Sequence, residues 1–198
     1  MKAIILASGV GKRLRPLTDN TPKPLVKINQ KSILEYQLIN LTQNDINHVI
    51  ITTGPFENQI KRFVQKKFPT VKVDYVHNPK YESTNYIYSL WLTKPFINDD
   101  ILLLHGDLVF TQRVLKKIKS APGNNVLVNK NVKPPKKDFK AVIEKDTVKK
   151  IGVDFFGEKT FFCLPLYKFI KKDFLIWINE MEQEINKGNV TIYAEDAF

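Results

Sequence analysis

The stretch that decides the fold is Ala3-Ile4-Ile5-Leu6-Ala7-Ser8-Gly9-Val10-Gly11-Lys12-Arg13, near the start of the chain. Its first five residues are all apolar, which predicts a strand buried on both faces of a parallel sheet. The loop that follows combines two glycines with cationic side chains. Glycine lets backbone N–H groups approach an anion closely, and Lys and Arg neutralise its charge. The stretch therefore predicts a phosphate-binding loop at the end of a strand.

The glycine pattern by itself also suits a structural turn. Gly9-x-Gly11 lacks the third glycine of the dinucleotide-binding pattern, because Leu14 stands there, and it lacks the Gly-Lys-Ser/Thr ending of a P-loop. Two further cations, Arg15 and Lys23, follow among prolines that stiffen the loop. A stiff basic loop favours the phosphate-binding interpretation over the turn.

Length and composition limit the class of protein. A chain of 198 residues predicts a single domain that can bury a core without disulfides or structural metals. The single cysteine, Cys163, excludes an internal disulfide and indicates a reducing compartment. We find no signal-peptide pattern and no apolar run of the ~20 residues that span a bilayer. These features predict a cytoplasmic protein without a membrane partner.

The formal net charge is +11. A basic surface can bind nucleic acid, because it releases counterions from the phosphate backbone. The lysines are, however, scattered along predicted helix faces and turns, and no nucleic-acid recognition motif accompanies them. We therefore expect no nucleic-acid partner, and a local positive field suited to a triphosphate.

Strand and helix signals alternate along the chain, as in a βαβ architecture. Strands are expected at residues 3–7, 49–53, 71–76, 101–104, 125–129, 139–144 and 147–152, with a hairpin turn at Asp146-Thr147. Helices are expected after the N-cap Ser32, at 56–68, after Thr111, and from Pro165 to about Lys187, where Gly188 closes the last one. This order predicts one α/β domain over residues 1–198, a Rossmann-like three-layer αβα sandwich with a mixed, mostly parallel sheet. Ligands of such sheets bind at the carboxyl ends of strands, where the basic loop and Asp107 both lie.

The opening motif resembles the signature of the sugar-phosphate nucleotidyltransferase family. The resemblance is carried by residues 6–14, by Pro16-Leu17-Thr18 and by Pro22-Lys23-Pro24, and Lys12 departs from it because the family usually has a small hydroxyl residue there. It implies the nucleotide-diphospho-sugar transferase fold, a nucleoside triphosphate substrate, and catalytic roles for Arg13, Lys23 and Asp107. The nucleotide-binding residues it suggests are Leu6, Ala7, Ser8, Gly9, Val10, Gly11, Lys12, Arg13 and Lys23, with Gly54, Asn85 and Ser89 as the best guess toward the base.

A second segment, Asn78-Pro79-Lys80-Tyr81-Glu82-Ser83-Thr84-Asn85-Tyr86-Ile87-Tyr88-Ser89-Leu90-Trp91, is equally typical of a helix packed by aromatic residues, with Thr84 as a candidate cap. It also resembles the phosphocholine and phosphonoalkyl cytidylyltransferase branch of the family. That branch implies transfer of CMP from CTP to a phosphorylated or phosphonylated small molecule, with release of pyrophosphate. The alternatives are a sugar-1-phosphate nucleotidyltransferase and a non-catalytic nucleotide-binding regulatory domain on the same fold.

The acceptor stays open between two chemistries. A quaternary ammonium such as choline binds aromatic faces, whereas a primary ammonium calls for carboxylates. Aromatic residues that could supply such faces include Tyr81, Tyr88, Trp91, Phe155, Phe156, Phe161 and Phe162. Tyr86 and Tyr193 could also do so, and Asp138 and Lys140 belong to a segment that also resembles the cytidylyltransferase branch. We name these four residues as the expected acceptor site.

Two acidic positions suggest a metal site. Asp107 follows an apolar strand, so it either forms a turn or binds Mg²⁺, which takes one or two carboxylates together with phosphate oxygens. Glu195 and Asp196 either begin a helix or, as the resemblance implies, one of them completes the magnesium site. The resemblance also implies a further helix and strand after Phe198, and leaves a homodimer open. His48, His77 and His105 show no metal-ligand spacing, and Cys163 is expected to be a core thiol.

Overall fold

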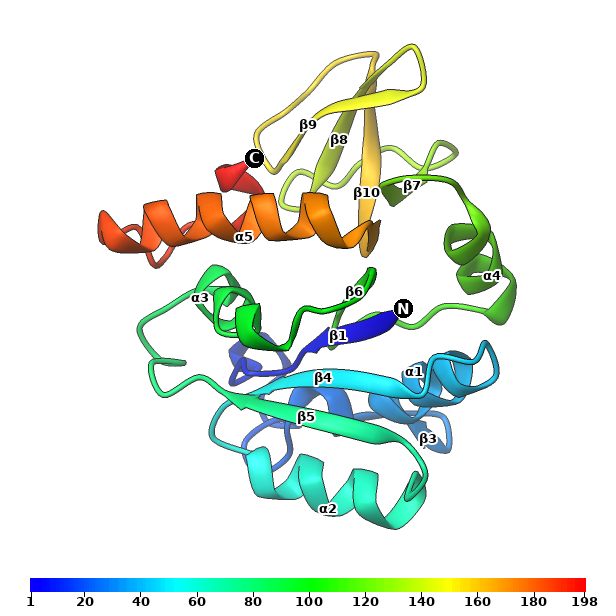
Figure 1. Cartoon of the computed structure of the whole chain (residues 1–198), viewed down its shortest axis with the longest axis vertical. Coiled ribbons are helices and arrows are strands. Elements are labelled where there is room, and N and C mark those ends of the chain that lie inside the picture. The colour runs from blue at the N-terminus through cyan, green and yellow to red at the C-terminus, as the bar shows by residue number, and fades with distance from the viewer.

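The computed structural model describes residues 1–198 and contains an eight-stranded sheet flanked by helices (Figure 1). The strand order is β5-β4-β1-β6-β10-β8-β9, with β7 paired to β10, and a separate two-stranded ribbon joins β2 and β3. The strands are β1 Lys2–Leu6, β2 Lys27–Ile28, β3 Lys31–Ser32, β4 His48–Thr53, β5 Lys72–His77, β6 Ile101–His105, β7 Asn125–Asn129, β8 Lys140–Glu144, β9 Thr147–Gly152 and β10 Thr160–Phe169.

Five α-helices and four short 3₁₀ helices complete the chain. The α-helices are α1 Ile33–Thr42, α2 Glu57–Lys67, α3 Tyr86–Trp91, α4 Gln112–Ser120 and α5 Lys171–Asn186. The 3₁₀ helices are η1 Lys12–Leu14, η2 Lys23–Leu25, η3 Lys94–Phe96 and η4 Ala194–Ala197. None of the helices is both long and apolar enough to cross a bilayer.

The first strand, β1, lies inside the parallel part of the sheet, and its side chains contribute to the cores on both faces of the sheet. β1 pairs in parallel with β4 and β6, and β5 extends this block in parallel beyond β4. Alternate β1 side chains point to opposite faces, so Ile4 and Ile5 enter two different cores, and both are fully buried. Helices α1, α2 and α4 cover the Ile5 face, while α3, α5 and η4 cover the Ile4 face. The predicted three-layer αβα sandwich with a mixed sheet is confirmed.

The remaining strands form an antiparallel block. β10 runs antiparallel to β6, β7 and β8, and β8 pairs antiparallel with β9. This block projects at one end of the molecule, opposite α2, and the C-terminus lies beside α5 and β9 (Figure 1). The hairpin between β8 and β9 turns at Lys145 and Asp146, which have φ angles of 48° and 59°. Two consecutive left-handed residues suit the right-handed twist of paired strands, so the turn lies one residue before the predicted Asp146-Thr147 pair.

Most predicted elements are present within one or two residues of their expected bounds. Ser32 caps α1, because its hydroxyl accepts the Glu35 backbone N–H at 3.2 Å. The cap of α3 differs from expectation. Asn85 holds the cap position, and the Thr84 hydroxyl instead donates to the Lys80 carbonyl at 2.8 Å.

The prediction that a helix begins at Pro165 is wrong. Pro165 lies within strand β10, and α5 begins at Lys171 and ends at Asn186. The pairing of β10 with β7 shifts register between Leu164 and Tyr167, so the proline lies at a bulge. Proline lacks the N–H that a strand ladder needs, and a bulge is one of the few strand positions that accept it. Gly188 follows the helix with φ 88°, as its predicted closing role requires.

Candidate active site

A cleft of about 600 Å³ opens at the carboxyl ends of the parallel strands. One wall comes from the loops after β1, β5 and β6, and the other from Tyr86, residues 137–139, β10 and Tyr193. Predicted site residues that line it are Leu6, Ala7, Ser8, Gly9, Gly11, Lys12, Arg13, Lys23, Asn85, Tyr86, Asp107, Asp138 and Tyr193. Val10, Gly54, Ser89, Lys140, Glu195 and Asp196 are not on its wall.

The loop after β1 is held in a defined shape. The Ala7 backbone N–H donates to the buried Thr52 hydroxyl at 3.0 Å, which anchors the loop to β4. Gly11 has φ 70°, and a β-carbon there would come within 3.0 Å of Thr18, whose hydroxyl donates to the Gly11 carbonyl at 2.8 Å. Only glycine accepts this conformation and this contact without strain. The loop is therefore prearranged before any ligand binds.

Gly54 supports this loop from below. A β-carbon at Gly54 would lie 2.2 Å from the Ser8 carbonyl oxygen, so the two backbones approach as closely as glycine permits. Gly54 thus lies behind the cleft wall. It packs against the Ser8 backbone, and it does not make the contact with the base that we predicted.

Lys23 and Asp107 come together across 84 residues of sequence. Lys23 begins η2, Asp107 follows β6, and the Lys23 ammonium donates to the Asp107 carboxylate. Burial opposes ionisation of Asp107, but the hydrogen bond and charge of Lys23 outweigh it and lower the pKa of Asp107. The lowered pKa keeps the Asp107 carboxylate ionised near neutral pH, so this pair presents a group suited to a cation beside a group suited to an anion.

Beneath the loop lies a chain of buried polar side chains. The hydroxyls of Ser8 and Ser89 are 2.7 Å apart, and the Asn78 amide donates to Ser89 at 2.9 Å. Ser89 and Asn78 are each 1% exposed. Ser89, which we expected to bind nucleotide, therefore acts from behind the wall, whereas Ser8 and Asn78 both face the cleft.

The opposite wall is aromatic. The rings of Phe139 and Tyr193 meet edge to face at 4.9 Å, and Tyr86 lies 6.0 Å from Tyr193. Asp138, next to Phe139, adds a carboxylate to this wall. Aromatic faces beside a carboxylate attract a cationic group.

Lys140 does not belong to this wall, which corrects its predicted acceptor role. It is 1% exposed, and its ammonium donates to the carbonyls of Lys136, Asp138 and Val153 at 2.7, 2.8 and 2.6 Å. All three ammonium hydrogens are thus used within the protein. Lys140 holds the segment that carries Asp138 and Phe139.

Glu195 and Asp196 also lie off the cleft wall. Glu195 is 3% exposed, and its two carboxylate oxygens accept the hydroxyls of Tyr86 and, at 2.7 Å, Tyr167. Burial, and next to it the Glu195 charge, raise the pKa of both tyrosines well above the usual range. Asp196 is exposed and accepts the Tyr193 backbone N–H at 2.9 Å, which caps η4.

The cleft offers a magnesium ion one of the carboxylates that we predicted for it. Asp107 is the one predicted metal carboxylate on the cleft wall, and no cluster of three or more His, Cys, Asp or Glu side chains gathers anywhere in residues 1–198. Magnesium is often held by one or two carboxylates plus substrate phosphates, so a single carboxylate suits the ion only when phosphates are bound. Of the three predicted metal carboxylates, Asp107 is therefore the one that could hold the ion.

Sequence reasoning missed several cleft residues. His105 is one: burial lowers the pKa of its ring, whose centroid is 4.8 Å from that of Tyr86 in an edge-on contact. Others come from β10. Pro165 was placed in the misplaced helix, and the residues just before it were assigned to no element, although the run Thr160–Phe169 is rich enough in aromatic residues to suggest a strand. Tyr81 and Phe162, two of the aromatic residues considered for the acceptor, also line the cleft. The wall residues that were not predicted are Leu14, Pro24, Asn78, Thr84, His105, Gly106, Leu108, Lys137, Phe139, Cys163 and Pro165.

The basic, glycine-containing loop at the strand ends, with a carboxylate beside it, defines an α/β protein that binds a phosphorylated ligand. Residues 2–192 match the nucleotidyl transferase family, and the chain belongs to this family.

Two similar proteins have names that state their activity more precisely than the family description does. Choline-phosphate cytidylyltransferase of Streptococcus pneumoniae is 48% identical over 94 residues, covering 48% of this chain and 39% of that protein. CTP:phosphoglutamine cytidylyltransferase of Campylobacter jejuni is 31% identical over 130 residues, covering 61% of this chain and 49% of that protein. The chain thus spans less than half the length of these relatives.

Solved structures resemble the whole chain. CTP:phosphocholine cytidylyltransferase from Streptococcus pneumoniae superposes with a TM-score of 0.77 and 28% identity, covering 99% of this chain and 82% of that one. The inositol-1-phosphate CTP transferase from T. maritima gives 0.74 and 25% identity, covering 87% of this chain and 71% of that one.

Proposed function

We propose that this protein transfers CMP from CTP to a small phosphorylated or phosphonylated acceptor with a cationic group, such as phosphocholine, and releases pyrophosphate. The observation that carries the proposal is the pairing of two walls in one cleft. One wall is the basic loop with Lys23 and Asp107, and the other is the aromatic wall of Tyr86, Phe139 and Tyr193 with Asp138. Relatives named as cytidylyltransferases support the choice of CTP.

The reaction needs positioning more than proton transfer. An oxygen of the acceptor phosphate attacks the α-phosphorus of CTP, and the bond from that phosphorus to the bridging oxygen of the leaving pyrophosphate breaks. The attacking oxygen is already an anion, so no general base is required. Catalysis then depends on alignment and on neutralising charge at the phosphates.

Each residue on the basic wall has a role in this scheme. Backbone N–H groups of Ser8–Gly11 and the Arg13 side chain hold the outer phosphates, and Lys23 neutralises charge that grows at the α-phosphate. Magnesium, when bound, supplies further neutralisation of phosphate oxygens, and Asp107 is the residue that would hold it. Binding requires Lys23 and Asp107 to exchange their mutual contact for contacts with ligands.

The acceptor is held by the opposite wall. A quaternary ammonium against the rings of Tyr86, Phe139 and Tyr193 gains about 0.5–2 kcal/mol per good contact. Asp138 adds a charge of opposite sign. This arrangement favours phosphocholine over a neutral sugar phosphate, which would need hydroxyl-binding groups instead of ring faces.

The test is a matrix of nucleotides and acceptors. The purified chain is incubated with Mg²⁺ and CTP, UTP, dTTP, GTP or ATP, each with phosphocholine, phosphoethanolamine, 2-aminoethylphosphonate or glucose 1-phosphate. Mass spectrometry then measures pyrophosphate and the nucleotide conjugate. We expect a CDP conjugate of a cationic acceptor as the main product. Nucleotide binding without pyrophosphate release would support the regulatory alternative, and a preference for glucose 1-phosphate would support the sugar enzyme.

A further inference from the structure

A chain of buried polar side chains lies against the loop that follows β1. The contacts of these side chains determine which group donates and which accepts in each hydrogen bond. This polar chain runs through Asn78, Ser89 and Ser8, which are 1%, 1% and 7% exposed. The argument starts at Asn78, whose side-chain oxygen accepts the Lys80 backbone N–H at 2.8 Å. This contact fixes which end of the amide is the donor.

Both hydrogens of the Asn78 amide are then assigned. One goes to the Ser89 hydroxyl oxygen at 2.9 Å and the other to the Thr84 hydroxyl oxygen at 3.1 Å. The Thr84 hydroxyl passes its own hydrogen to the Lys80 carbonyl at 2.8 Å. The Ser89 oxygen is therefore an acceptor from Asn78, and its single hydrogen needs a partner of its own.

Only one partner serves that hydrogen. The Ser89 hydroxyl contacts no acceptor besides the Ser8 oxygen at 2.7 Å. If Ser8 donated instead, the Ser89 hydrogen would be buried without an acceptor, which costs about 1–3 kcal/mol. Ser89 thus donates to Ser8. The hydrogen of Ser8 has no protein acceptor, and since Ser8 lines the cleft it is available to a ligand.

The position of Ser8 in the sheet indicates which part of a nucleotide it meets. Asn78 follows β5 and Ser8 follows β1, whereas Asp107, with Lys23 bonded to it, follows β6 on the other side of β1. The cleft residues on the β5 side are Asn78, Tyr81, Thr84 and Asn85, none of which is a cation. Phosphates favour the cationic side, so the uncharged base faces Ser8.

We propose that Ser8, oriented by Ser89 and Asn78, is a specificity-determining residue that donates a hydrogen bond to N3 of cytosine. The inference rests on the proposed function. Cytosine has an unprotonated N3 that accepts a hydrogen bond, whereas N3 of uracil carries a hydrogen. With uracil, that hydrogen meets the hydrogen of Ser8, and one of the two loses its partner. A fixed donor therefore favours CTP over UTP, and Ser89 and Asn78 act as positioning residues.

The test compares equilibrium binding of CTP and UTP to the full chain by calorimetry, with Mg²⁺ and without acceptor. We expect Ser8→Ala to weaken CTP binding about five- to tenfold, as for one lost hydrogen bond, and UTP binding less than about twofold. Ser8→Thr keeps the hydroxyl and should keep the preference, and Ser89→Ala should reduce it. The control is Ser83→Ala, which removes an exposed hydroxyl from the loop between β5 and α3, the loop that also contains Asn78.

The inference would be overturned if Ser8→Ala left the ratio of CTP affinity to UTP affinity unchanged, whether both affinities fell equally or neither fell. Thermal unfolding followed by circular dichroism verifies that each variant is folded. If Ser89→Ala does not fold, the results for Ser8→Ala and Ser8→Thr decide whether the inference holds. Product formation by the wild-type chain tests the proposed function separately. A wild type that makes the CDP conjugate while Ser8→Ala retains its preference overturns the role of Ser8 alone.

Discussion

The ion pair between Lys23 and Asp107 shows how two individual residues shape the site. Lys23 lowers the pKa of Asp107, and each of the two residues is expected to serve a different ligand once a nucleotide arrives. The motifs around both residues allowed them to be predicted, because an anion-binding loop and a strand-end carboxylate have local signatures. Lys140 has no such signature. Whether a lysine reaches a ligand or three backbone carbonyls depends on folding of residues far apart in sequence.

The first prediction concerns Lys23→Ala. Removing a cation that acts on transition-state charge should lower kcat about 100- to 1,000-fold while KM for CTP changes much less. Steady-state kinetics with phosphocholine measures both constants. Lys27→Ala, at an exposed lysine on β2, is the matched control and should behave like the wild type. A raised KM with normal kcat would show that Lys23 only binds substrate.

The second prediction concerns Asp107→Asn. Loss of the carboxylate should reduce Mg²⁺-dependent turnover at least about 100-fold, because several kcal/mol of charge stabilisation disappear. The fold should survive, since the partly exposed ion pair with Lys23 contributes about 1 kcal/mol or less to the free energy of unfolding. A magnesium titration of activity, with a parallel urea unfolding curve, separates the two effects. Full activity in the variant would remove Asp107 from the metal role.

At the scale of elements, strand β10 marks the limit of prediction from sequence. The strands of the parallel block were found because continuous apolar runs bounded by loops are distinctive. β10 was taken for a helix start because Pro165 suits the first turn of a helix equally well. Only the pairing partners β6, β7 and β8 decide between these structures, and they lie far away in sequence, as Phe169 and its partner Ile101 show. The place of Pro165 on the cleft wall was missed for the same reason.

Tyr167, on β10, gives the third prediction. Tyr167→Phe leaves one oxygen of the buried Glu195 carboxylate without its donor, so the free energy of unfolding should fall by about 1–3 kcal/mol. Urea unfolding followed by circular dichroism measures the loss. Tyr75→Phe is the matched control, because the Tyr75 hydroxyl on β5 makes no hydrogen bond. Equal stability of both variants would argue against a structural role for the Tyr167–Glu195 contact.

Cys163, also on β10, gives a pH prediction. Burial raises the pKa of its thiol from 9.0 to about 12. Below pH 9 the thiol is protonated in both states and has no effect. Above it the unfolded chain releases the proton and the folded chain keeps it, so stability falls as pH rises toward about 12. The free energy of unfolding of Cys163→Ala should therefore decline less steeply than that of the wild type over this range, and parallel slopes would contradict the assignment.

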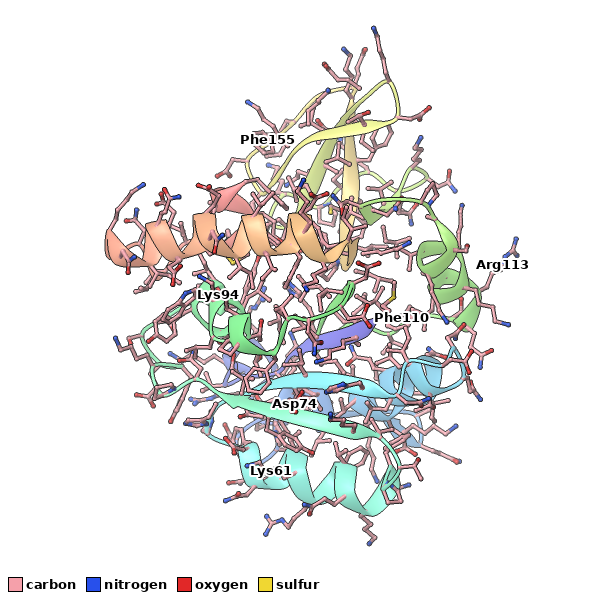
Figure 2. The ribbon with its side chains drawn as sticks, viewed as in Figure 1. Lys61, Asp74, Lys94, Phe110, Arg113 and Phe155 are labelled. Carbon is pink, nitrogen blue, oxygen red and sulfur yellow. The ribbon has the colours of Figure 1, made fainter.

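At the scale of the whole molecule, the charge of +11 is spread over the surface. Figure 2 shows Lys61 on α2 and Arg113 on α4 at well-separated places, with Lys94 near α3. Such a distribution raises the local concentration of any small anion around the protein. It does not by itself select a ligand, so composition alone could not identify the substrate.

The fifth prediction follows from this field. The Kd of CTP should rise several-fold between about 50 and 300 mM NaCl, because salt screens the attraction between the triphosphate and the cationic side chains. Calorimetry at each salt concentration measures it. Cytidine, which carries no phosphate, is the control and should bind equally at all concentrations. A salt-independent Kd for CTP would show that the cations contribute little to nucleotide affinity.

The bulge at Pro165 has a consequence for how the two substrates are aligned. Before it, β10 pairs with β8, next to the segment that carries the acceptor wall, and after it the same strand pairs with β6, next to the nucleotide loop. One continuous backbone thus connects the two walls of the cleft. If the proposed function holds, we expect the bend of this single strand to govern how far an acceptor oxygen lies from the phosphorus that it attacks.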